Sequence, residues 1–375
     1  MIVLAIQTIG ICLFRVWLNG ETKPDFIFDQ NPAAFSEDRF TRTMSVNWVY
    51  NLYLRDAILP IYLSCDWSGR SIPLIQHFHD NRVLIVLAFW TLLLLIVQSL
   101  FFSPTIPTKT TTTTTTWGAR RIVLIAFFTF IFSPFLLSSN LLVRVGLMKG
   151  DRVIYLPIAG LCILEALAFQ MLFCQKNKGS KKIALPRKTL GWILLLSQLT
   201  FFAVKLNERN LAWSNSLLLW TSAYDVNPKS FHTMYNCGYE LALAGQYERA
   251  EQVMRPIADP HVDGPSNTYV YAMTLKNLDK CDEAHYFIDR ALNVIYQKKE
   301  NPQNQRDRSS TLLRTESNLL VVKAMCTFDV AETGRLMYKA VEVDPMNQYA
   351  RDQAEHLLKK VEMIQKMKDK GINVT

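Results

Sequence analysis

The residues of this chain best placed to bind a charged group are Asp151 and Arg152, which stand directly before a long apolar run, residues 153–174. An arginine there can bind a phosphate, because its guanidinium donates paired hydrogen bonds and a helix N-terminus carries partial positive charge. Asn140, which ends the preceding apolar run, is expected at the same membrane boundary. We therefore predict a lipid-phosphate site made by Arg152, Asp151 and Asn140. The alternative is that Arg152 reaches toward the interface while Asp151 caps the helix.

A second group of candidate residues consists of aromatic, amide and thioether side chains in the C-terminal half. Their spacing predicts that they share the inner face of a helical array, where hydroxyl and amide groups can hydrogen-bond an extended peptide. These residues are Tyr235, Asn236, Tyr239, Tyr269 and Met273. The alternative is that the same side chains pack between neighbouring repeats.

Other side chains that often carry chemistry form no pattern here. The seven cysteines are scattered, with no CxxC pair and no cysteine–histidine cluster, so we expect neither a metal site nor a disulfide framework. The net charge of +9 is a poor argument for nucleic acid, because many basic residues flank apolar runs and there set membrane orientation. We therefore expect no metal, no cofactor and no nucleic-acid partner.

The elements that must position these residues begin with five apolar runs, each long enough to cross a hydrocarbon layer about 30 Å thick. The chain has 375 residues and is 50% hydrophobic, and nearly all its long apolar runs lie in the first half. This asymmetry excludes both a single soluble domain and a disordered chain. The sequence predicts a polytopic membrane bundle over residues 1–206. Its spans are expected near residues 1–18, 83–102, 122–140, 153–174 and 189–206.

Basic residues in the short loops orient these spans. Residues 176–188 hold six lysines and arginines, the most basic connection in the chain, and are therefore placed in the cytosol. The chain from residue 207 onward then lies on the other side, in a lumen. The apolar stretch 46–64 joins two loops of that same side and carries Arg55 and Asp56 at its middle. We expect an interfacial or re-entrant helix there, with two short crossings as the alternative.

The C-terminal half has an internal period of 34 residues, the length of a tetratricopeptide (TPR) helix–turn–helix repeat. Small side chains recur where two helices of a repeat must pack closely. They are Ser216, Ala250 and Ala284. Gly238 is expected to allow a close helix crossing, and the one-sided stretch 349–370 is expected to cap the array. The predicted fold class is all-α: a transmembrane helix bundle followed by a TPR α-solenoid over residues 207–375. An unrelated α-hairpin bundle is the alternative.

Several local strings, read together with this order of domains, are similar to one family. The strings include Asn31-Pro32-Ala33-Ala34-Phe35, Cys65-Asp66-Trp67-Ser68 and Asp151-Arg152-Val153-Ile154-Tyr155-Leu156-Pro157. The chain resembles the transmembrane and TPR repeat-containing family (TMTC). That resemblance implies a multi-pass protein of the endoplasmic reticulum that transfers mannose from dolichyl phosphate mannose to Ser or Thr of client proteins, cadherin-type domains among them.

The resemblance also implies a pair of catalytic acids in the first lumenal loop, and this chain has no counterpart of that motif. We therefore name no catalytic residue and expect the chain to lack the N-terminal catalytic part of the family. The acids that follow the first span are expected to be solvated loop residues. The alternative function is a non-catalytic, membrane-anchored TPR adaptor that binds lumenal proteins.

Overall fold

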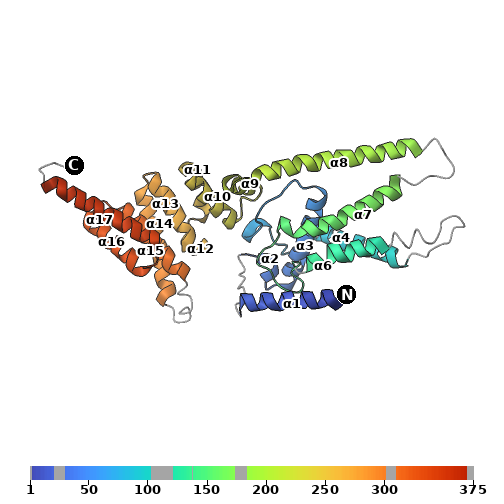
Figure 1. The fold of residues 1–375 in the computed structure, drawn as a ribbon, viewed down its shortest axis with the longest axis horizontal. Coiled ribbons are helices and arrows are strands. Elements are labelled where there is room, and N and C mark those ends of the chain that lie inside the picture. The colour runs from blue at the N-terminus through green and yellow to red at the C-terminus, as the bar shows by residue number, and fades with distance from the viewer. Residues whose placement is uncertain are drawn as a thin grey trace. The chain divides into compact units, whose positions relative to one another are not determined.

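In the part of the chain that it describes, the computed structural model consists of helices joined by irregular segments and has no strands (Figure 1). The described residues are 2–20, 30–102, 121–136, 138–173, 184–300 and 310–369. They form two compact units that interleave along the chain. The first is Met1–Tyr53, Pro73–Lys149 and Val153–Leu164, and the second is Leu54–Ile72, Gly150–Arg152 and Glu165–Thr375. The predicted domain boundary at residue 206 divides the membrane-spanning part of the chain from the rest. The two units are defined by internal contacts, so they do not test this boundary.

Apolar helices occupy all five predicted spans. Three of them are long and apolar enough to cross a membrane, within α4 (Asn81–Phe102), η3 with α7 (Asp151–Ile154 and Tyr155–Phe173) and α8 (Ala184–Ala212). The other two coincide with shorter apolar helices, Ile6–Leu18 within α1 (Ile2–Asn19) and Arg121–Leu136. The chain is therefore a membrane protein.

The helix over the predicted interfacial stretch starts and ends earlier than its apolar pattern indicates. It is α3, Arg39–Ile58, and Asp38 accepts a hydrogen bond from the Thr41 N–H (2.7 Å) at its start. The helix stops at Ile58 because Pro60 disfavours helical geometry in the residue before it. Residues 59–64, which we expected to continue the helix, form an irregular segment instead.

The third predicted span, residues 122–140, is also shorter than predicted. A π-helical stretch, Ala126–Phe132, precedes α6 (Ser133–Leu136), where the apolar helix ends. The wide turn suits Pro134, which has no N–H to donate to the preceding turn. Gly160 of α7 lies against this stretch, and a Cβ there would come within 2.7 Å of the Ile131 side chain.

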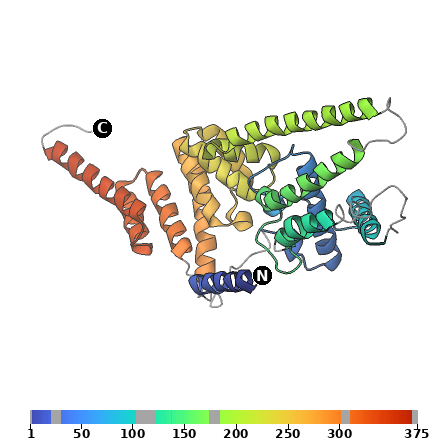
Figure 2. The same ribbon diagram turned by 45° about the vertical axis from the view of Figure 1, so that its right-hand side comes forward.

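Beyond α8, the second unit continues as stacked helices, which Figures 1 and 2 show from two sides. They are α9 (Ser216–Val226), α10 (Phe231–Leu243), α11 (Tyr247–Met254), α12 (Pro260–Asp263), α13 (Pro265–Asn277), α14 (Cys281–Glu300), α15 (Ser310–Met325), α16 (Val330–Val343) and α17 (Gln348–Asp369). The starts of α10 and α13 are 34 residues apart, as are the starts of α11 and α14. This spacing matches the 34-residue period found in the sequence, and the assignment of the helices to TPR repeats stays a prediction.

The small residues at this period differ in their surroundings. Ala250 and Ala284 are fully buried where paired helices pack, and Gly238 of α10 faces the buried Met254 of α11, as a close helix crossing requires. Ser216 is different, because it is exposed at the first position of α9. The prediction of a close helix contact at Ser216 is therefore wrong.

Candidate functional site at the end of the last apolar helix

The final turns of α8 change from apolar to charged. Lys205, Glu208 and Arg209 follow a long apolar run within one helix. Charges are costly in hydrocarbon and common at its edge, so this end of α8 marks a membrane boundary. A group bound here would meet an apolar phase on one side and water on the other.

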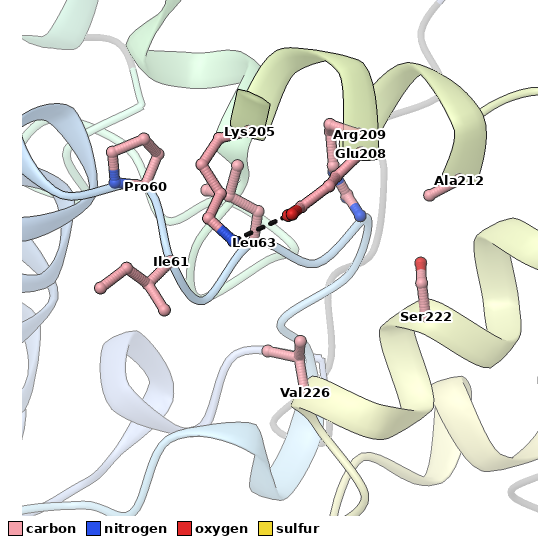
Figure 3. A pocket seen from close by; sticks show the side chains of 9 residues that line it. All are labelled: Pro60, Ile61, Leu63, Lys205, Glu208, Arg209, Ala212, Ser222 and Val226. Atoms are coloured by element: carbon pink, nitrogen blue, oxygen red, sulfur yellow. Dashed lines mark hydrogen bonds and ion pairs between the residues drawn. The ribbon is translucent and has the colours of Figure 1, made fainter. Parts of the chain in front are cut away.

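A cavity of about 150 Å³ opens at this place, between the end of α8, α9 and the irregular segment after α3 (Figure 3). Part of its lining is apolar and comes from Pro60, Ile61, Leu63 and Val226. The polar part comes from three charged side chains of α8 and the Ser222 hydroxyl. An apolar wall with a few converging polar groups is the usual lining of a small-molecule site.

Arg209 is the charged group of this cavity with spare hydrogen-bonding capacity. Lys205 and Glu208 neutralise each other, with Nζ and Oε2 2.7 Å apart (Figure 3). The Arg209 guanidinium stacks 5.8 Å from the centre of the Trp213 ring. Its Nη2 is buried and has no hydrogen-bond acceptor among the described residues. Leaving such a donor unsatisfied costs about 1–3 kcal/mol, so an anionic oxygen at this position would be bound favourably.

Asp151 lies beside this cavity and holds the segment that lines it. Its two carboxylate oxygens accept hydrogen bonds from the Ser64 N–H (3.0 Å) and from Trp67 Nε1 (3.3 Å). It is also an electrostatic partner of Arg209. Asp151 was predicted at a lipid-phosphate site; the structure shows it holding the segment after α3 beside Arg209, and its role toward phosphate stays a prediction. Arg152 is exposed.

Asn140, the third predicted residue, belongs to the first unit and shapes a loop there. It has a positive φ of 61°, and its Oδ1 accepts hydrogen bonds from Asn31 Nδ2 (3.1 Å) and the Val145 N–H (3.0 Å). Asn31 also donates to the backbone carbonyls of Val145 and Leu147. Through these hydrogen bonds Asn140 stabilises the loop. Its predicted role in binding phosphate stays a prediction.

The segment after α3 also docks on the stacked helices α9 to α17, which we call the helical array. Asp66 Oδ2 lies 3.0 Å from His232 Nδ1 on α10, and Asn227 Nδ2 donates to the Asp66 carbonyl (3.2 Å) and to Ser71 Oγ (2.8 Å). Burial raises the pKa of Asp66, but hydrogen bonds from His232 and Ser68 outweigh burial and lower it overall. The hydrogen bond to Asp66 raises the pKa of His232. This contact therefore pairs the Asp66 carboxylate with an imidazole whose pKa is raised, and it favours the protonated form of His232.

The contact between Asp66 and His232 is expected to weaken as pH rises above 6.5. Because the folded pKa of His232 is above its ordinary value of 6.5, the pair is fully charged below that pH and is lost as pH rises through the raised pKa. On the acid side, the lowered pKa of Asp66 means that the carboxylate is lost only as pH falls below 3.8. Hydrogen exchange of residues 64–71, corrected for intrinsic rates, should show more opening at about pH 8 than at about pH 6. His232→Gln should remove this difference, and an unchanged pH dependence in that variant would contradict the assignment.

The predicted peptide-binding residues lie on the array, three of them in one tyrosine cluster. The rings of Tyr235 and Tyr239 stack 6.3 Å apart. Burial, and then the nearby hydroxyls of Tyr349, Tyr239 and Tyr235, raise the pKa of Tyr269 to about 12. Four tyrosines from α10, α13 and α17 thus gather, and Tyr349 is a member that the sequence analysis missed.

The other two predicted residues are more constrained. The Asn236 amide donates to the His232 carbonyl one turn earlier (2.8 Å). Met273 packs against the hydrophobic core. Whether this face binds a peptide stays a prediction. Among the residues that the structure describes, no group of three His, Cys, Asp or Glu side chains could hold a metal ion.

Comparison with known proteins supports the resemblance found in the sequence. Residues 20–94 match the family model described as "Protein O-mannosyl-transferase TMTC, DUF1736", a range that includes the Asn31–Phe35 and Cys65–Ser68 strings. This chain is related to the TMTC protein O-mannosyl-transferases. The family resemblance read from the sequence is thereby confirmed.

Individual TMTC relatives match most of this chain. The chain is 30% identical to protein O-mannosyl-transferase TMTC4 of Mus musculus over 67% of its own length and 32% of the relative. It is 30% identical to TMTC3 of Mus musculus, over 78% and 30% respectively, and 28% identical to Tmtc3 of Drosophila melanogaster, over 74% and 28%. The chain thus spans about a third of the length of the curated relatives it matches. No solved structure matches it.

Proposed function

We propose that this chain takes part in protein O-mannosylation at the endoplasmic reticulum membrane. The donor is dolichyl phosphate mannose, and the acceptors are Ser or Thr side chains of client proteins, cadherin-type domains among them. The relation to TMTC supports the reaction class. The observation that carries the proposal in this chain is the unsatisfied Arg209 donor in a cavity at a membrane boundary.

The cavity suits the phosphate end of a polyprenyl lipid. In the transfer, mannose C1 exchanges its bond to the phosphate oxygen for a bond to the acceptor hydroxyl oxygen, and the hydroxyl proton passes to a base. The lipid phosphate leaves with the bonding electrons, and a guanidinium beside it stabilises that charge. Arg209 serves this role, while Ile61, Leu63 and Val226 contact the apolar part of the lipid. The catalytic base is not assigned to any residue of this chain.

The helical array supplies the client-binding half of the proposal. With residues 176–188 in the cytosol, the array from residue 207 onward lies in the lumen, where secretory clients are found. The tyrosine cluster of Tyr235, Tyr239, Tyr269 and Tyr349 offers aromatic surface and hydroxyl groups to an extended chain. The array would thus hold a client near the lipid donor.

Arg209→Ala is expected to weaken binding of a polyprenyl phosphate about tenfold or more, because a charge-assisted hydrogen bond is lost. Binding would be measured with the full chain in lipid nanodiscs. Arg249→Ala is the matched control, since Arg249 is an exposed arginine of α11 that bonds to Gln246 away from the cavity. The control should bind as the unmodified chain does.

Arg152→Ala in the same assay decides between the two arginines. If Arg209→Ala binds polyprenyl phosphate unchanged and Arg152→Ala loses binding, then the phosphate is bound by Arg152, the exposed arginine that the sequence first indicated. If the unmodified chain captures lumenal clients but binds no polyprenyl phosphate, this result would favour the alternative function of a non-catalytic adaptor.

A further inference from the structure

Two cysteines far apart in the sequence meet in the helical array. Cys281 is the first residue of α14, and Cys326 directly follows α15. Cys326 belongs to the hydrophobic core of the array, with 4% of its surface exposed, and the half-buried Cys281 packs against the same core. Both side chains are free thiols in this structure.

The contacts around the two thiols place Cys281 and Cys326 close together. Helices α14 and α15 pack against each other. His285, one turn after Cys281 on the same side of α14, places its Nε2 3.1 Å from the Cys326 carbonyl oxygen. Burial, and then the nearby Cys281 thiol, raise the pKa of Cys326 to about 12. A neighbouring helix thus fixes the position of Cys326 relative to Cys281.

We propose that Cys281 and Cys326 form a disulfide under oxidising conditions and that this bond fastens α14 to α15. Its formation in the cell rests on the lumenal placement of the array in the proposed function, because thiols in the cytosol are kept reduced. The oxidant is a disulfide of a thiol–disulfide oxidoreductase or of glutathione.

The order of steps in this thiol–disulfide exchange follows from the different exposure of the two sulfur atoms. Cys281 is the accessible one, so its thiolate attacks the incoming disulfide and forms a mixed disulfide, releasing one thiol. The Cys326 sulfur, deprotonated in that step, then attacks Sγ of Cys281 and releases the second thiol. The pair loses two electrons and two protons, and the incoming disulfide gains them.

The bond would close the loop of chain between residues 281 and 326, which includes the connection from α14 to α15. Closing a loop of this length removes conformational freedom from the unfolded chain, and the thermal midpoint of the array is expected to rise by about 5–10 °C. The bond would also fix the angle between two successive helical hairpins, α13–α14 and α15–α16, beside the tyrosine cluster.

The test uses the purified full chain in detergent, equilibrated with oxidised or reduced glutathione. After blocking of the remaining thiols and proteolysis, mass spectrometry should show the peptides of Cys281 and Cys326 joined in the oxidised sample alone. Cys281→Ser and Cys326→Ser should each abolish the joined peptide and the rise in thermal midpoint. Cys237→Ser, which removes another buried thiol of the array, should change neither.

Failure of the joined peptide to form in the purified chain, or glutathione remaining attached to Cys281, would overturn the proposal whatever the topology. In cells, reduced thiols in chains whose array is shown to be lumenal would also overturn it. Joined peptides in the purified chain, with reduced thiols and a cytosolic array in cells, would support the cysteine pair and contradict the proposed function instead.

Discussion

Replacing Gly238 by valine is expected to lower the free energy of unfolding of the helical array by about 3 kcal/mol. A Cβ at this position would lie 2.1 Å from Met254 Cγ and 2.5 Å from its Sδ, and Met254 is fully buried. A close-packed interior has no space into which that side chain could move. Denaturant unfolding of the full chain, followed by hydrogen exchange in α10 and α11, measures the loss.

Gly334→Val is the matched control for this prediction. Gly334 lies within α16, and nothing stands within 4 Å of a Cβ built there. The same substitution should change the free energy of unfolding by less than about 0.5 kcal/mol, because valine and glycine differ only modestly in helix propensity. Equal losses at the two positions would show that the substitution acts through the helix backbone and not through the contact of Gly238 with Met254.

Lys299→Met is expected to destabilise the array by about 3–5 kcal/mol, because it leaves a buried carboxylate without its cation. Lys299 of α14 pairs with Glu316 of α15, whose side chain is only 2% exposed. The methionine keeps most of the apolar stem, so the change reports mainly the charge. Denaturant unfolding of the full chain measures it.

The control for that pair is Lys323→Met. Lys323 is as exposed as Lys299 (25% against 27%), but its partner Asp289 is 55% exposed and stays hydrated when alone. A loss below about 1 kcal/mol is expected there. If Lys299→Met is equally mild, then the Glu316 carboxylate is not held by this ion pair in the folded chain.

Much of the fold follows from patterns of apolar residues. The five apolar runs and the 34-residue period both correspond to helices in the structure, because each pattern repeats over many residues and is set by burial. The residues at which helices end are harder to predict from sequence. The end of α3 depends on one proline at position 60, and the third apolar helix contains a π-helical stretch that no periodicity indicates.

The candidate site is harder to predict from sequence, because it joins distant segments. Asp151 was found from its place before an apolar run, yet its hydrogen bonds to Ser64 and Trp67 come from a loop more than eighty residues earlier. Arg209 was missed, although a signal exists: Lys205 and Arg209 stand one turn apart where the last apolar run ends. The spacing of Cys281 and Cys326 gives no such signal, and only the packing of α14 on α15 brings the two thiols together.

The measurement that tests the whole account most directly is the side of the membrane on which the helical array lies. Arg306→Thr creates an N-glycosylation acceptor at Asn304, between α14 and α15, and Arg306→Ala is the control without one. We predict a glycan on the threonine variant that an endoglycosidase removes, and an array that protease cannot reach in sealed microsomes. An unmodified acceptor together with rapid digestion of the array from outside would place it in the cytosol and contradict a role in mannosylating secretory clients.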